Sequence, residues 1–123
     1  MAVRAIRGAT QLERDEREHL LDRVAELVTE VLHRNDVATD DLISVVFTAT
    51  PDLRSEFPAY AARRSGITDV PLLCAQEVDV AGAMPRVVRV LAHAETELPR
   101  AEVRHVYLHG AAALRTDLRR DPG

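Results

Sequence analysis

The sequence of 123 residues contains no lysine, and all sixteen of its basic residues are arginine. Without lysine there is no Schiff base on a side-chain amine, no pyridoxal phosphate linkage and no lysine-dependent phosphate loop. Aromatic residues make up only 3% of the chain, tryptophan is absent and the formal net charge is −4. Few stacking surfaces and a negative charge argue against nucleic acid as a partner.

The low cysteine content and the lack of long apolar runs bear on where in the cell the protein is found. A single cysteine, Cys74, excludes an intramolecular disulfide and fits a reducing, cytoplasmic location. No apolar run approaches the length of a membrane span, and two arginines interrupt the apolar N-terminus, so neither a membrane anchor nor a signal peptide is expected. Residues 1–123 are expected to form a single domain with a mobile C-terminal tail from about residue 116.

One long helix stands out in the pattern of apolar residues. Between Leu20 and Leu32 they recur at helical spacing with charged residues between them, which predicts an amphipathic helix that ends near Asn35. Thr10 and Glu13 fit a capping box for its start, although the helix can begin as late as Asp15. A second, short helix is expected at residues 55–64, ended by Gly66.

Strands account for most of the remaining order. They are expected at Arg4–Ala9, Leu42–Thr48, Val70–Cys74 and Val103–Leu108, with Arg86–Ala94 ambiguous between strand and helix and Pro99–Glu102 a turn or one helical turn. Two of these runs, at residues 42–47 and 87–92, are almost continuously apolar, which suggests strands covered on both faces. Because one long helix can cover only one face, another copy of the chain is expected to cover the second.

Five short motifs run through nearly the whole chain. They are R-x-I-R-G-A-T at residues 4–10, T-A-T-P-D-L at 48–53, C-x-Q-E-x-D-V at 74–80, R-H-V-Y-L at 104–108 and L-R-x-D-L at 114–118. In this order and at this spacing they resemble the small, trimeric, monofunctional chorismate mutases. The resemblance implies an α+β fold with a mixed β-sheet, in a homotrimer whose sheets form a barrel-like core with active sites between subunits. It also favours a strand at residues 86–94.

The same resemblance implies the Claisen rearrangement of chorismate to prephenate, in phenylalanine and tyrosine biosynthesis, without a metal or other cofactor. Arg89 would hydrogen-bond the ether oxygen of the chorismate dianion, while Glu77 and Cys74 would contact its ring hydroxyl and the positive side of the polarised ring. Arg7 and Tyr107 would bind the enolpyruvyl carboxylate. The other substrate-binding positions that it implies are Phe57, Ala59, Arg63, Leu72, Leu73, Leu114 and Arg115. Of these, the segment around Phe57 would border the cleft from the neighbouring subunit.

Without the resemblance, the same residues have simpler interpretations. Arg89 stands in an apolar run, so it must either face water or be paired, because an unpaired buried charge is very costly. Cys74 alone is typical of an inert buried thiol, and Glu77 of a surface carboxylate. His105 and His109 lie four residues apart without an obvious third ligand, so no metal site is expected.

Two functions of other classes stay open at this point. One is an imine or enamine deaminase on a related trimeric fold, and the other is a non-catalytic sensor of an aromatic-pathway metabolite. Two positions also depart from the chorismate mutase pattern. Tyr60 stands where that family often carries lysine, and Leu73 replaces a typical hydroxyl residue. These departures concern substrate affinity more than the reaction itself.

Overall fold

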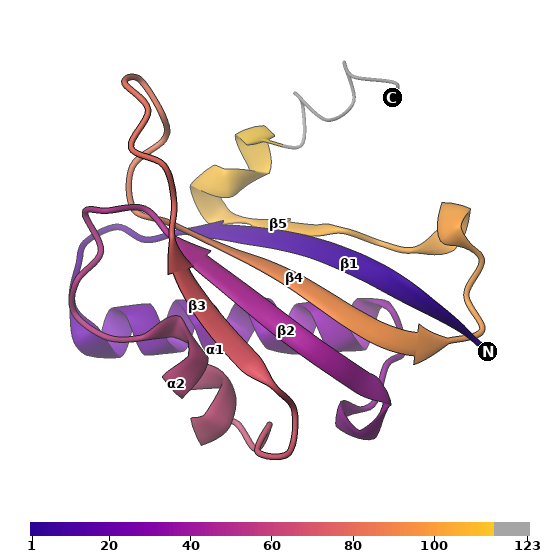
Figure 1. Ribbon diagram of the computed structural model, residues 1–123. Coiled ribbons are helices and arrows are strands. Elements are labelled where there is room, and N and C mark those ends of the chain that lie inside the picture. Colours follow the sequence, from indigo (N-terminus) through magenta and orange to yellow (C-terminus); the bar gives the residue numbers. More distant parts are fainter. Residues whose placement is uncertain (115–123) are drawn as a thin grey trace.

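The computed structural model describes residues 1–114 and has a five-stranded mixed sheet with two α-helices on one of its faces (Figure 1). The strands are β1 (Ala2–Gln11), β2 (Leu42–Ala49), β3 (Leu72–Gln76), β4 (Val87–Thr96) and β5 (Val106–Leu108), and the helices are α1 (Arg17–Arg34) and α2 (Pro58–Arg64). The strand order is β3-β2-β4-β1-β5; β4 is antiparallel to both neighbours, and the edge strands β3 and β5 are parallel to theirs. The predicted α+β fold is confirmed.

The long helix α1 forms where the apolar spacing predicts it and supplies most of the core on one side of the sheet. Its buried residues are Leu20, Leu21, Val24, Leu27, Val28 and Val31. Figure 1 shows α1 running behind the sheet, and α2 contacts α1, β2 and β3. Among residues 1–114, neither helix has the length and apolar character needed to span a bilayer.

The two faces of the sheet differ because side chains alternate along each strand. Ile6, Phe47 and Val90 point to the helices and are almost completely buried. The opposite face, which we call the uncovered face, carries Arg7 and Arg89. It is covered at one end by the 3₁₀-helix η3 (His109–Ala113), where Ala9, Val87 and Ala111 form a second small buried cluster.

The predicted capping box is wrong. Thr10 lies inside β1 and is fully buried, because β1 continues to pair with β4 beyond it. The helix α1 begins after Glu16, whose carboxylate accepts hydrogen bonds from the backbone N–H groups of Glu18 at 2.6 Å and His19 at 3.3 Å. A carboxylate at a helix start is also favoured by the helix dipole. Long-range strand pairing therefore overrode a local motif.

The other helix ends agree more closely with the sequence. The helix α1 ends before Asn35 as expected, and the residue after Asn35, Asp36, has a left-handed backbone with φ 51°. The helix α2 begins at Pro58 rather than residue 55, since proline fits the first helical position. Gly66, with φ 102°, follows its end.

The ambiguous segment at residues 86–94 is a strand, β4, and lies at the centre of the sheet. Two strands start later than expected, β3 at Leu72 instead of Val70 and β5 at Val106 instead of Val103. The predicted turn at residues 99–102 contains the 3₁₀-helix η2 (Arg100–Glu102). The prediction of a mobile tail from about residue 116 falls outside the described residues.

Candidate active site

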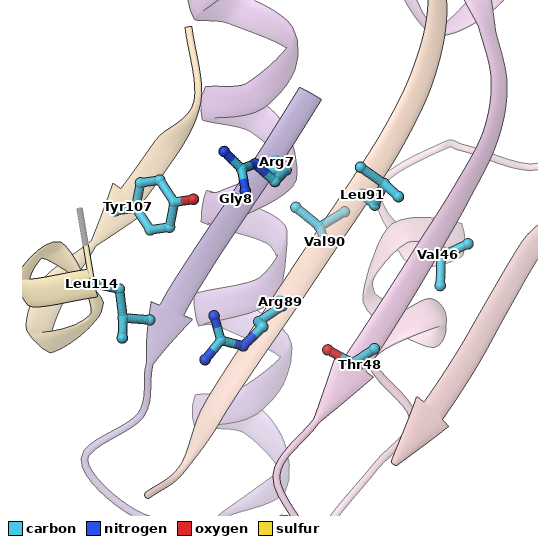
Figure 2. Close-up of a pocket in the computed structure, with 9 residues that line it drawn as sticks. All are labelled: Arg7, Gly8, Val46, Thr48, Arg89, Val90, Leu91, Tyr107 and Leu114. Atoms are coloured by element: carbon cyan, nitrogen blue, oxygen red, sulfur yellow. The ribbon is translucent and has the colours of Figure 1, made fainter. Parts of the chain in front are cut away.

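A pocket of about 450 Å³ opens on the uncovered face of the sheet (Figure 2). It is lined by Arg7, Gly8, Val46, Thr48, Arg89, Val90, Leu91, Tyr107 and Leu114. These residues come from β1, β2, β4 and β5 and from the end of η3, so the pocket depends on the whole sheet rather than on one loop.

The register of the strands explains why the polar side chains meet there. Ala9 of β1 is the partner of Arg89 in β4 and of Tyr107 in β5, and Thr48 of β2 is also a partner of Arg89. Paired residues point to the same face of a sheet, and Arg7 follows the same alternation two residues before Ala9. The two arginines, the phenol and the hydroxyl therefore all project from the uncovered face.

Arg89 is held in place by a short chain of charged hydrogen bonds. Its Nε lies 3.2 Å from both carboxylate oxygens of Glu77, and Thr48 Oγ1 donates to Glu77 Oε2 at 2.7 Å. The side chain of Glu77 is only 17% exposed, whereas that of Arg89 is 45% exposed. The Nη groups of Arg89 make no hydrogen bond within residues 1–114 and are directed into the pocket in Figure 2. Arg89 is therefore a preorganised donor, fixed through one side of its guanidinium.

The second polar part of the pocket consists of Arg7 and Tyr107. In Figure 2 the Tyr107 hydroxyl is directed toward Arg7, and within residues 1–114 neither side chain has a hydrogen-bond partner. The apolar side chains of Val46, Leu91 and Leu114 line the space beside them. Two guanidinium groups and a phenol next to an apolar wall suit a small organic anion that carries more than one negative charge.

The structure thus brings together five of the predicted site residues. Arg7, Arg89, Tyr107 and Leu114 line the pocket, and Glu77 is bonded to Arg89. Arg115 was also predicted at the site, but it lies outside the described residues.

Cys74 lies apart from this group within one chain. Its strand partner is Phe47, which faces the helices, and the Cys74 Sγ accepts a hydrogen bond from the backbone N–H of Ala59 at 3.3 Å. Ala59 is buried, and Leu72 is partly buried against the same core. These three predicted site residues therefore face α2 or the core and not the pocket around Arg89.

The remaining predicted residues lie near the edge of the sheet formed by β3. Leu73 shares the uncovered face with its partner Val46 and is 61% exposed, Phe57 precedes α2 and is 70% exposed, and Arg63 is exposed on α2. A second pocket of about 450 Å³ is found there, lined by residues 49–50, 53–58 and 74–76, which include Phe57 and Cys74. In the strand order, β3 is at the opposite edge from β5, which carries Tyr107.

The loop that presents Phe57 is fixed by hydrogen bonds. Asp15 accepts from the backbone N–H groups of residues 54 and 55 at 3.0 and 3.1 Å. Glu56 accepts from the N–H of Phe57 and from Arg17, each at 3.0 Å. The bond from Phe57 lowers the pKa of the Glu56 carboxyl more than burial raises it, and Arg17 lowers it further. Phe57 is therefore exposed on a backbone that hydrogen bonds hold in place.

One contributor to the site, Thr48, was not predicted from the sequence. It begins the T-A-T-P-D-L motif, but nothing local to the motif indicates that its hydroxyl binds Glu77. Its strand partner Arg89 lies far away in the sequence, so the contact follows only from the pairing of β2 with β4.

The two histidines considered for a metal site have other partners. His105 Nδ1 accepts a hydrogen bond from the backbone N–H of Arg7 at 2.9 Å, and His109 Nε2 lies 2.7 Å from Glu26 Oε1. His105 precedes β5 and His109, with φ 53°, begins η3, so the two imidazoles do not lie on one strand. Within residues 1–114, no three His, Cys, Asp or Glu side chains are grouped so that they could hold a metal ion.

Comparison with known proteins agrees with this geometry. The family profile described as Chorismate mutase type I matches residues 3–118. The chain is 40% identical to the chorismate mutase AroH of Bacillus subtilis (strain 168) over 119 residues, 96% of this chain and 94% of the relative. It is 49% identical to the chorismate mutase AroH of Thermus thermophilus over 117 residues, 94% and 96% of the two chains. The solved structure of a chorismate mutase from Clostridium thermocellum superposes with a TM-score of 0.88 at 38% identity, covering 89% of this chain and 98% of the other.

Proposed function

The chain belongs to the chorismate mutase type I family and is a chorismate mutase, and we propose that it rearranges chorismate to prephenate in the pocket between Arg7 and Arg89. The enzyme is an isomerase and serves the biosynthesis of phenylalanine and tyrosine. One observation carries the assignment of the site. The Nη groups of Arg89, the Arg7 guanidinium and the Tyr107 hydroxyl converge on one pocket and are unpaired within residues 1–114.

The reaction determines what the pocket must do. In this pericyclic step one C–O bond breaks as one C–C bond forms, and it needs no nucleophile, cofactor or obligatory proton transfer. The protein must hold a flexible dianion in its compact, reactive conformer and stabilise the negative charge that grows on the ether oxygen. Fixed donors in a partly apolar pocket do both.

Each residue of the pocket has a role in this proposal. Arg89 donates to the ether oxygen, and its orientation is supported by the bond from its Nε to Glu77. Glu77 also contacts the ring hydroxyl of the substrate. Arg7 binds the enolpyruvyl carboxylate in the two-pronged manner that a guanidinium allows, with Tyr107 as a further donor. Leu114 lies over the bound ligand.

The other predicted residues form the second half of a shared site. Phe57, Arg63 and Leu73 are exposed near the β3 edge of the same chain, and Cys74 lines the pocket there with Phe57. We propose that this edge of one subunit meets the Arg89 pocket of the next. An interface that joins two different surfaces of identical chains closes into a ring when the rotation permits it.

The uncovered face supports the same assembly. It leaves Val3 54% exposed and Leu73 61% exposed, in a sheet whose other face is packed by two helices. Burial of such apolar area against another copy is favourable. We propose a homotrimer, the state implied by the family resemblance, with three intersubunit sites. A cytoplasmic location belongs to this proposal, and the free thiol of Cys74 fits a reducing compartment.

The test is to incubate the pure protein with chorismate and follow the loss of diene absorbance together with the appearance of prephenate. We expect cofactor-free turnover that a chelator leaves unchanged. A deaminase would instead release ammonia from imine or enamine substrates supplied in a parallel assay. A sensor would bind chorismate in a calorimeter without converting it, and that result would overturn the proposed function.

A further inference from the structure

On the β4 side Arg7 is held by regular strand pairing with Leu91, but on the β5 side its backbone is bound by a side chain. Its backbone N–H donates to His105 Nδ1 at 2.9 Å, and the parallel pairing of β1 with β5 begins only at the next residue pair, Gly8 with Val106. The Arg7 N–H, which lies one residue before the first β1–β5 pair, is therefore bound by an imidazole and not by a backbone carbonyl of β5. The hold on Arg7 from the β5 side therefore depends on what residue 105 is and whether it is protonated.

The chain before His105 is prevented from extending β5. The N–H of Arg104 donates to Asn35 Oδ1 at 2.7 Å, and its carbonyl accepts from Asn35 Nδ2 at 2.9 Å. Asn35 is 1% exposed, so both peptide groups of Arg104 are bound to a fixed partner at the end of α1. This anchor leaves the His105 side chain as the acceptor that faces β1.

Close packing transmits this contact to the pocket. A Cβ added to Gly8 would meet the Val106 carbonyl oxygen at 3.0 Å, Val90 Cγ1 at 3.0 Å and Leu27 Cδ1 at 3.1 Å. The backbone next to Arg7 is therefore enclosed on three sides, and there is little room for it to shift without moving the Arg7 side chain.

Only one form of the imidazole can accept this bond. Nδ1 must keep its lone pair, so the neutral ring carries its proton on Nε2. Burial, and secondarily the charge of Arg7, lower the pKa of His105 and favour that neutral form. Within residues 1–114, the Arg7 guanidinium on β1 is the charged group that acts on this imidazole.

We infer that His105 is a positioning residue for substrate binding, because its neutral Nδ1 holds the β5 side of the Arg7 backbone and so fixes the position of the guanidinium in the pocket. This rests on the proposed function, in which Arg7 binds a carboxylate of chorismate. Protonation of Nδ1 removes the acceptor and leaves two N–H donors facing each other, so the Arg7 backbone loses its fixed position. Substrate binding therefore weakens in acid, while the rearrangement step itself is unchanged.

Two variants distinguish the hydrogen-bond acceptor of His105 from the bulk of its side chain. His105→Asn keeps a carbonyl oxygen near the position of Nδ1 but cannot be protonated, whereas His105→Leu keeps the bulk and loses the acceptor. At neutral pH we expect KM to rise about five- to tenfold in the leucine variant, the effect of one lost hydrogen bond, with kcat nearly unchanged. The asparagine variant should stay within about twofold of wild type. His33→Leu, at an exposed position on α1, is the matched control.

The pH profile supplies a readout that a purely structural role would not change. In wild type we expect KM to rise only as the pH falls through the folded-state pKa of His105, which lies below the ordinary histidine value of about 6.5, whereas KM of His105→Asn stays flat. Identical KM profiles for these two proteins, or an unchanged KM in a folded His105→Leu variant, would overturn the inference. If His105→Leu does not fold, the comparison of wild type with His105→Asn still decides.

An NMR titration distinguishes failure of this inference from failure of the proposed function. The amide resonance of Arg7 should move with the titration of His105 in wild type and remain still in His105→Asn. A moving resonance without chorismate turnover would support the contact and contradict the proposed function. A resonance that ignores His105 in an active enzyme would contradict the contact alone.

Discussion

The two faces of the sheet are made by the same strands and have opposite properties. Phe47 and Val90 face the helices and are buried, while their neighbours Thr48 and Arg89 face the pocket. One face thus carries the core that stabilises the chain, and the other carries charged donors that the core cannot accommodate. Because the side chains alternate, a substitution at one position should affect stability and a substitution at the next should affect activity.

The uncovered face is also the incomplete one. The covered face is packed by α1 and α2 of the same chain, whereas the uncovered face is packed by η3 at one end only, among the elements of residues 1–114. In our account, a neighbouring copy supplies both the missing cover and the missing half of each site.

The largest expected effect is on the covered face. Phe47→Ala removes a fully buried aromatic side chain, and such changes lower the free energy of unfolding by about 3–5 kcal/mol. Urea denaturation measures this loss, and kcat per folded subunit should change far less. Val78→Ala, at a loop position that is 83% exposed, is the control and should be nearly neutral. A Phe47→Ala variant of normal stability would show that the core is misidentified.

The next effect is on the uncovered face. Arg89→Ala removes the donor to the developing oxyanion, and kcat should fall by about 10²–10³ while the melting temperature stays near wild type. Arg89→Lys should rescue poorly, because one ammonium cannot both bind Glu77 and donate to the ether oxygen as the guanidinium does. Arg34→Ala, which breaks an exposed pair with Glu30, is the matched control. If Arg89→Ala keeps most of its kcat, the central role of this residue is wrong.

A smaller effect should come from the support of Glu77. Thr48→Val keeps the shape of the side chain and removes the hydroxyl that donates to Glu77. We expect kcat to fall by about tenfold, the consequence of losing a hydrogen bond to a charged group, and Thr48→Ser to stay near wild type. Steady-state kinetics of the three proteins measure this, and equal kcat values for Thr48→Val and wild type would remove Thr48 from the site.

The smallest expected effect is on the stability of the fold in acid, and it comes from His105. Burial, with a smaller effect of Arg7, lowers the pKa of His105 in the folded state, so the folded chain binds this proton less readily than the unfolded chain. The resulting stabilisation is fully present above the unfolded pKa of about 6.5 and is lost as the pH falls through the lower folded pKa. Melting temperatures measured against pH should therefore fall less steeply in His105→Asn than in wild type. Parallel curves would indicate that His105 titrates normally.

The sequence predicted the polar residues of the pocket better than the contacts that hold them. The resemblance assigned Arg7, Arg89 and Tyr107 to the substrate, and all three line the pocket, although only Arg7 and Tyr107 lie within the five motifs. The bond of Thr48 to Glu77 and that of His105 to Arg7 join segments far apart in the chain, and only the strand pairing reveals them.

Strand geometry explains the other differences. The segment at residues 70–74 is apolar throughout, so its composition did not indicate which face each side chain takes, and only the pairing of Cys74 with Phe47 shows that the thiol faces the helices. Thr10 matched a helix-start motif, but its place in β1 is stabilised by partners in β4 that a local pattern does not include. Helix α1, with its long amphipathic pattern, needed no such information.

The central claim is that the uncovered face is one half of a site that a neighbouring copy completes. In this account Arg89→Ala disables one half and the charge reversal Arg63→Glu disables the other, so each variant alone is inactive in every cleft. Inactivity of Arg63→Glu by itself must be established first, with its fold checked by circular dichroism.

The two variants are then unfolded together in equal amounts, refolded and assayed with chorismate, and mass spectrometry confirms that mixed assemblies have formed. A cleft works only if its first half comes from the Arg63→Glu chain and its second half from the Arg89→Ala chain. Random assembly of a ring gives each condition a chance of one half, so we predict that about a quarter of wild-type activity returns. No recovery in confirmed mixed assemblies would place both arginines in the cleft of one subunit and contradict the account.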